Sequence, residues 1–251
     1  MVALGIESSC DETSIAVYST ENGTLSSKTF SQADIHSAFG GVIPEVASRN
    51  HIQKIEPLYH ACMEESGIKD KDLDIIGVTN APGLIGALFV GVSFAKGLGY
   101  ALNKPVLPVH HLAGHILSAE LSYKELQPPY TALIVSGGHT HIFDVDEALN
   151  FTLLGRTIDD AAGEVFDKTL QAARLMKREK IVVGGGVAAN SEIRRVFYEN
   201  SDSINVYFPE LARCTDNGEM IAYAATRFYK FRKFLNYKGS AYDTKHSIGL
   251  L

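Results

Sequence analysis

The sequence predicts an α/β protein made of two similar halves, and three observations carry this prediction. Each half opens with three strand-like segments in succession. Helical and strand-like segments then alternate in each half, which is typical of a sheet covered by helices. A short proline-rich segment, KELQPPY at residues 124–130, lies between the halves. We therefore expect a duplicated α/β fold with domains at residues 1–125 and 126–251.

In the first half, short apolar or alternating runs predict strands, and apolar residues three or four positions apart predict helices. Pro44 suits the first turn of a helix, where its missing N–H has no partner to lose. The expected strands are residues 2–8, 13–19, 23–32, 73–80 and 104–109, and the expected helices are residues 44–66, 86–103 and 111–120.

The second half repeats this order of segments. A meander of three strands precedes an alternation of helix and strand that ends in a helix. The expected strands are residues 130–138, 140–146, 151–157, 179–186 and 204–209, and the expected helices are residues 159–176, 190–201 and 217–231. Because the same order occurs twice, the pattern indicates duplication of one α/β unit.

Composition and charge narrow the classes of function. No apolar run reaches the roughly 18 residues that span a bilayer, and the start, MVALGIESSCDE, lacks the basic region of a signal peptide, so we expect no membrane. Cys10, Cys62 and Cys214 share no disulfide or metal spacing, which is typical of reduced thiols in a cytoplasmic protein. The formal net charge of −6 is unfavourable for binding nucleic acid without a partner.

Small, polar turns follow three of the expected strands, within residues 5–14, 133–141 and 181–190. Glycine and serine let the backbone approach a ligand closely, and successive N–H groups can hold an anion. A tight turn without a ligand is the alternative. None of these turns is a Walker loop, because no GK[ST] occurs, and GGGVAAN lacks features of a dinucleotide fingerprint.

Two histidines four residues apart, His111 and His115, would share one face of a helix and could bind one metal ion. Asp216, at the start of the last helix, could supply a third ligand. Two nitrogens and one carboxylate with open positions suit iron(II) or zinc(II). The alternative is a structural role for these residues at helix starts.

Six motifs occur in order along the chain: GIESSCDET, VHHLAGH, VSGGHT, DDAAGEVFDK, GGGVAAN and TDNGEMIA. Together they resemble the TsaD family, bacterial transferases that form threonylcarbamoyladenosine in tRNA and were once described as O-sialoglycoprotein endopeptidases. The resemblance extends to about Arg227. It implies the ASKHA fold, the actin- and hexokinase-like fold, with two duplicated α/β domains and a ligand cleft between them.

The resemblance also implies a reaction and partners. Threonylcarbamoyl-AMP, supplied by a separate synthase, would give its threonylcarbamoyl group to N6 of adenosine 37 in tRNAs that read ANN codons. Threonylcarbamoyl-AMP, ATP or ADP would occupy the cleft, with one divalent ion, iron(II) ahead of zinc(II). TsaB-like and TsaE-like proteins and tRNA are the expected partners.

Carried over by position, the resemblance assigns roles to individual residues. His111, His115 and Asp216 match the metal ligands. His139 and Asp11 are both candidates for the catalytic base, and the sequence does not choose between them. The expected substrate contacts are Val135, Ser136, Gly137, Gly138, His139, Asp167, Gly185 and Asn190.

Three other functions remain alternatives. A zinc peptidase needs a glutamate directly after the first histidine, but Leu112 is there. A sugar kinase or ATPase would need no histidine pair. An inactive scaffold would need no metal site, yet the chain departs from the family pattern near residues 169–171, where several tens of residues with a YPGGP-like motif are missing. Either the natural protein carries a segment there that this sequence omits, or the deletion is natural and puts activity in doubt.

Overall fold

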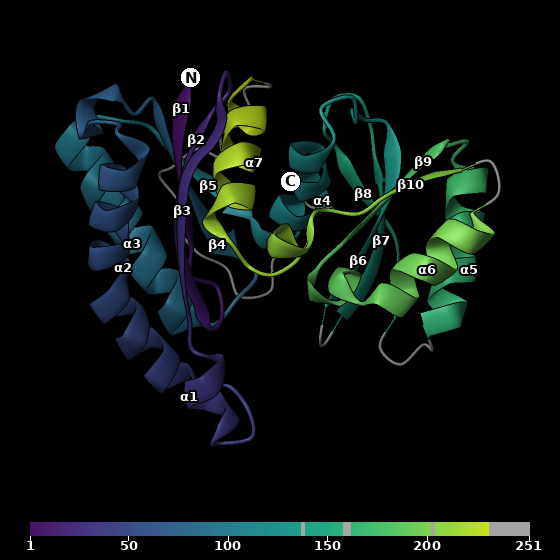
Figure 1. The fold of residues 1–251 in the computed structure, drawn as a ribbon, viewed down its shortest axis with the longest axis horizontal. Coiled ribbons are helices and arrows are strands. Elements are labelled where there is room, and N and C mark those ends of the chain that lie inside the picture. The colour runs from purple at the N-terminus through teal and green to yellow at the C-terminus, as the bar shows by residue number, and fades with distance from the viewer. Residues whose placement is uncertain (137–138, 158–161, 202–203, 231–251) are drawn as a thin grey trace. The chain divides into compact units, whose positions relative to one another are not determined.

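The computed structural model describes residues 1–136, 139–157, 162–201 and 204–230 (Figure 1). The chain forms two compact units. One contains Met1–Gly114 and the segment that starts at Asp216, and the other contains His115–Thr215. The division falls inside helix α4 (His111–Ser122). The expected boundary at residues 125 and 126 lies just after this helix, and the last described helix belongs with the first unit.

The first unit has a five-stranded sheet in the order β3-β2-β1-β4-β5. Its strands are β1 (Val2–Glu7), β2 (Glu12–Ser19), β3 (Gly23–Ser31), β4 (Ile75–Ala81) and β5 (Val106–His110). The first three strands form an antiparallel meander, whereas β1, β4 and β5 are parallel. All five expected strands therefore occur, with ends shifted by one or two residues.

Helices α2 (Pro44–Ser66) and α3 (Ile85–Leu102) lie on one side of this sheet, and α7 (Gly218–Lys230) lies on the other (Figure 1). The expected helix at residues 44–66 is confirmed at both ends, because Pro44 opens it and Gly67, at φ 66°, ends it. Ile55, Tyr59 and Met63, four residues apart, form its buried face. The short helix α1 (Ala33–Ser37) was not expected.

Helix α7 packs against β1 and β4 at backbone distance. A side chain at Gly5 would place its Cβ 2.1 Å from the carbonyl oxygen of Gly218. A Cβ at Gly77 would lie 2.6 Å from the Cβ of Ala225. Glycine is required at these positions because the helix occupies the space of any larger side chain.

Helix α3 is long and apolar enough to correct the expectation that no apolar run reaches the length that spans a bilayer. Its 18 residues have a mean hydropathy of 1.5, so by length and composition it could cross a membrane. A core helix passes the same test. Ala87, Leu88, Val92 and Ala95 of α3 are buried in the first unit, so this single helix is weak support for a membrane segment.

The second unit repeats the topology of the first, with strand order β10-β9-β6-β7-β8. Its strands are β6 (Tyr130–Ser136), β7 (His139–Val145), β8 (Phe151–Thr157), β9 (Lys180–Gly184) and β10 (Asn205–Tyr207). Strands β6, β7 and β8 form an antiparallel meander, and β6, β9 and β10 are parallel. The predicted duplication is confirmed, because strands in corresponding sequence positions occupy corresponding places in the two sheets.

Helices α5 (Ala162–Leu175) and α6 (Ser191–Asn200) follow β8 and β9. Phe197 of α6 meets the rings of Phe166 and Phe208 edge to face, with ring centroids 4.6 and 5.8 Å away. Helix α5 runs without interruption through residues 169–171, where the sequence departs from the family pattern. Thr169 and Leu170 are buried there, so the junction is part of the core.

We predict that Gly77→Val destabilises the first unit because valine would force α7 away from the sheet. The expected loss in the free energy of unfolding is about 3 kcal/mol, measured by denaturant titration. Gly97→Ala is the control, since a Cβ there meets nothing within 4 Å and alanine favours a helix. Equal effects of the two substitutions would contradict the role of close packing.

Candidate metal centre and adjoining turns

The carboxyl ends of three neighbouring parallel strands bring polar side chains together in the first unit. Glu7 ends β1, Thr79 is near the end of β4, and His111 directly follows β5. The register pairs Ile6 with Val78, so Glu7 and Thr79 are adjacent on neighbouring strands. Ligand sites of open α/β sheets commonly lie at this edge.

The three predicted metal ligands lie together at this edge. One ligand atom each from His111, His115 and Asp216 lies within 4.8 Å of the others. His111 and His115 are one turn apart on α4, so both rings project from one side of the helix. Two imidazole nitrogens and a carboxylate oxygen suit a divalent transition ion. Metal binding itself stays a prediction.

The position of Asp216 follows from how the start of α7 is held. Asn217 accepts a hydrogen bond from the backbone N–H of Met220 at 2.9 Å, which caps the helix. The Gly218 N–H donates to Ser14 Oγ of β2 at 2.8 Å. These bonds hold Asp216 beside α4, where its Oδ1 lies 3.3 Å from Nε2 of His111.

His111 lies between two carboxyl groups. Its Nδ1 is 3.1 Å from Oε2 of Glu7, on the opposite side of the ring from Asp216. Burial alone would lower the pKa of His111, but the negative charges of Asp216 and Glu7 outweigh it and raise that pKa well above 6.5. The two carboxylates therefore favour the doubly protonated, positively charged form of His111 when no ion is bound.

The turn at residues 8–11 is anchored on several sides. Ser8 Oγ donates to the carbonyl oxygen of Ala87 at 3.0 Å. The backbone N–H of Leu84 donates to the carbonyl oxygen of Ser9 at 2.8 Å. Nε2 of buried His51 lies 3.0 Å from the carbonyl oxygen of Cys10. Burial lowers the pKa of His51, so the neutral ring donates this bond.

This turn carries one of the two expected candidates for the base, Asp11, and a neighbour that sequence reasoning missed. Burial, together with the hydrogen bond and charge of Asp11, raises the pKa of Glu12 to about 8. A carboxyl group that titrates there can hold or accept a proton near neutral pH. Burial and the charge of Asp11 raise the pKa of the Cys10 thiol to about 12, so this thiol is not a nucleophile.

In the second unit, part of the expected substrate-binding set lies at the corresponding sheet edge. Val135 and Ser136 end β6, and Gly185 follows β9 with φ 88°. A Cβ at Gly185 would lie 2.4 Å from the carbonyl oxygen of Val135, so packing alone requires glycine there. Asn190 accepts hydrogen bonds from the N–H groups of Glu192 and Ile193 and caps α6, a structural role beside the expected substrate contact.

The other four expected residues lie at the start of β7, on α5 or outside the described residues. Gly137 and Gly138 lie outside the described residues. His139 is the first residue of β7. Asp167 is exposed on α5, and the structure gives it no further role.

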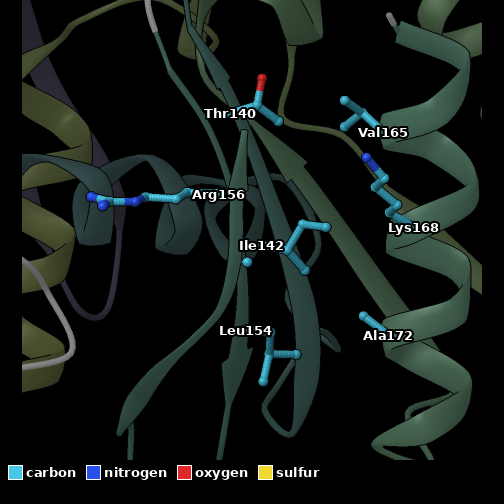
Figure 2. A pocket seen from close by; sticks show the side chains of 8 residues that line it. Thr140, Ile142, Leu154, Arg156, Val165, Lys168 and Ala172 are labelled. Carbon is cyan, nitrogen blue, oxygen red and sulfur yellow. The ribbon is translucent and has the colours of Figure 1, made fainter. Parts of the chain in front are cut away.

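A groove of about 230 Å³ lies elsewhere in the second unit, between β7, β8 and α5 (Figure 2). Val165, Lys168 and Ala172 of α5 point toward the strands, while Arg156 points away from the helix (Figure 2). Ile142 and Leu154 make the strand side of the groove largely apolar. The polar side chains among the residues that line the groove are Thr140, Arg156 and Lys168.

The chain matches the family model of TsaD, tRNA N6-adenosine threonylcarbamoyltransferase, over residues 23–177 and 168–223. The chain belongs to this family. The two matched ranges of the family model meet at residues 168–177, which is where the sequence departs from the family pattern. The family predicted from the six motifs is therefore confirmed.

Relatives named tRNA N6-adenosine threonylcarbamoyltransferase are similar along nearly their whole length. The one from Chromobacterium violaceum is 36% identical over 320 residues, covering 92% of this chain and 94% of the relative. The one from Fusobacterium nucleatum is 37% identical over 322 residues, covering 95% and 94%. Both alignments are longer than the 251 residues of this chain, so part of each relative has no counterpart here.

Solved structures with low sequence identity share the fold. The ROK hexokinase from Thermus thermophilus has a TM-score of 0.52 and 12% identity, covering 90% of this chain and 98% of its own. YeaZ from Pseudomonas aeruginosa has a TM-score of 0.50 and 16% identity, covering 93% and 94%. The expected ASKHA fold is confirmed.

We predict that binding a divalent ion at pH 7.5 releases more protons than an unperturbed histidine ligand would, because the negative charges of Asp216 and Glu7 raise the pKa of His111 and the ion displaces the proton on its Nε2. An unperturbed histidine, with a pKa of about 6.5, would release roughly a tenth of a proton. Calorimetric titration with Zn²⁺ in two buffers of different ionisation enthalpy measures this number. Equal heats in the two buffers would contradict the charge assignment.

Proposed function

We propose that this chain transfers a threonylcarbamoyl group from threonylcarbamoyl-AMP to N6 of adenosine 37 in tRNAs that read ANN codons. The observation that carries the proposal is the geometry of His111, His115 and Asp216 in a chain that belongs to the TsaD family. Nothing favours the peptidase alternative, since Leu112 stands where a zinc peptidase needs its glutamate.

The three ligands fit one divalent ion, iron(II) or zinc(II). When bound, the ion would supply positive charge that orients and polarises the carbonyl group to be transferred. His111, His115 and Asp216 would hold that charge at the edge of the sheet. Glu7 and Thr79 support His111 from the interior.

The remaining steps are assigned to residues of the turns. N6 of adenosine attacks the carbonyl carbon, and the bond from that carbon to the AMP phosphate oxygen breaks. Backbone N–H groups of the polar turns suit the negative charge that develops on the departing phosphate. The amine must also lose a proton. Asp11, Glu12 and His139 are the candidates to accept it, and the raised pKa of Glu12 adds this residue to the two expected from sequence.

The proposed partners are tRNA, TsaB-like and TsaE-like proteins, and the synthase that supplies the donor, all in the cytoplasm. One surface feature supports a protein partner. Ile52 of α2 is 63% exposed, and Ile85 and Phe89 of α3 are 54% and 52% exposed. The two helices pack against each other, and a Cβ at Gly86 would lie 2.3 Å from Oγ of Ser48. A partner that covers these side chains would remove apolar surface from water.

Transfer of labelled threonylcarbamoyl from its adenylate to tRNA, with and without TsaB-like and TsaE-like partners, tests the proposed function. We expect metal-dependent transfer in the complete mixture. A folded chain that binds metal and partners but transfers nothing would support the inactive scaffold. Metal-dependent peptide cleavage that is lost with His111→Ala would contradict the transferase.

We predict that the double variant His111→Ala, His115→Ala loses the ion, because one carboxylate cannot hold a transition ion against buffer and water. Elemental analysis of purified protein measures occupancy per chain. The double variant His36→Ala, His60→Ala is the control, since these histidines lie away from the centre on α1 and α2. Full occupancy in the first double variant would overturn the assigned ligands.

A further inference from the structure

The carboxylate of Glu7, at the end of β1, is fully buried beside the candidate metal ligands. The backbone N–H of Ser9 donates to its Oε1 at 2.6 Å, and Thr79 Oγ1 donates to its Oε2 at 2.5 Å. Nδ1 of His111 lies 3.1 Å from the same Oε2. A buried acid with this many polar neighbours has a defined orientation.

These contacts fix the direction of the hydrogen bond to His111. An ionised carboxylate can only accept, and Ser9 and Thr79 both donate to this one. The two hydrogen bonds that Glu7 accepts favour its ionised form. Nδ1 of His111 must then be the donor.

The other ring nitrogen faces the ligand group. Nε2 of His111 lies 3.3 Å from Oδ1 of Asp216. With Nδ1 protonated and bonded to Glu7, the lone pair of Nε2 becomes available to an ion in place of its proton. We propose that Glu7 is a positioning residue for the divalent ion: it holds His111 with Nδ1 protonated and Nε2 directed at Asp216 and the ion. This inference rests on the metal site of the proposed function.

Charge supports the same arrangement. Glu7 and Asp216 carry two negative charges on opposite sides of His111, which match the charge of a divalent ion when the histidines are neutral. Carboxylates that accept from metal-bound histidines orient the ring and increase its basicity. Thr79 and Ser9 in turn hold the carboxylate of Glu7.

One rival hydrogen bond involves Ser9, whose Oγ lies 3.3 Å from Nδ1 of His111. If Ser9 donated to Nδ1, the ring would carry its proton on Nε2 and could not bind the ion through that atom. The carboxylate contact is shorter and charged, and charge-assisted hydrogen bonds are the stronger kind. Ser9→Ala therefore separates the two arrangements.

The test measures Zn²⁺ affinity of the full chain by competition with a chromogenic chelator, and the tautomer of His111 in the Zn²⁺-bound chain by ¹⁵N NMR of the imidazole ring. Glu7→Gln should weaken the affinity about 10- to 100-fold and reduce the population with Nδ1 protonated. Thr79→Val should shift both readouts in the same direction by less, and Thr79→Ser should restore them. Ser9→Ala should leave both unchanged.

Glu120→Gln is the matched control. Glu120 is a buried carboxylate on the same helix as His111, and it accepts a hydrogen bond from Tyr130 at 2.9 Å. Its substitution should affect stability without changing Zn²⁺ affinity. If Glu7→Gln fails to fold, Thr79→Val and its serine counterpart decide the question.

Two results would overturn the inference, and they differ in whether the metal site of the proposed function survives. Wild-type affinity and an unchanged tautomer in folded Glu7→Gln would remove the role of Glu7 and leave the metal site and the proposed transfer intact. A wild-type chain that binds no Zn²⁺, Fe²⁺ or Co²⁺ would overturn the metal site together with the inference.

Discussion

The close contact of α7 with the first sheet is the constraint on which the candidate centre depends. The helix comes last among the described elements, yet it packs on β1 and β4, the strands whose carboxyl ends carry Glu7 and Thr79. Glycines at positions 5, 77 and 218 allow this approach. Because Asp216 directly precedes the helix, the same contact brings it within 3.3 Å of His111, more than 100 positions earlier in the chain.

The two units share a topology but supply different chemistry at their corresponding sheet edges. In the first unit, the edge gathers acids and histidines, and buried groups such as His51 hold its turn in place. In the second unit, Ser136 ends β6 and Gly185 follows β9. The backbone at Gly185 lies close to the backbone of Val135. One fold can therefore offer ion ligands at one edge and a backbone surface suited to an anion at the other.

The sequence predicted the elements well because local signals agree with the tertiary structure. Pro44 and the glycine after Ser66 mark the ends of α2, and its apolar spacing matches its buried face. The grouping of His111 with His115 follows from helical spacing. Asp216 was offered as a third ligand from its place at a helix start, and the resemblance supported it. No local pattern reports the packing of α7 that places it.

What the sequence missed shares one cause. Glu7 and Thr79 fall within the expected strands at residues 2–8 and 73–80, and no local pattern gave either of them a functional role. Their roles depend on β1 and β4 being neighbours in the sheet, which strand order decides and single segments do not reveal. Asn190 has a structural role that its place before a helix could have predicted, the cap of α6, and its expected substrate contact stays a prediction.

The departure from the family near residues 169–171 affects the two edges differently. The candidate ligands and their supports come from residues 7–9, 79, 111–115 and 216, none of them near the junction in sequence. Asp167, expected to contact the nucleotide, lies on α5, the helix that runs through the junction. A natural deletion there would leave the candidate ligands in place while removing a segment that relatives carry close to Asp167 in sequence. We therefore expect ion binding not to depend on that segment, whereas the contact expected of Asp167 lies next to it in sequence.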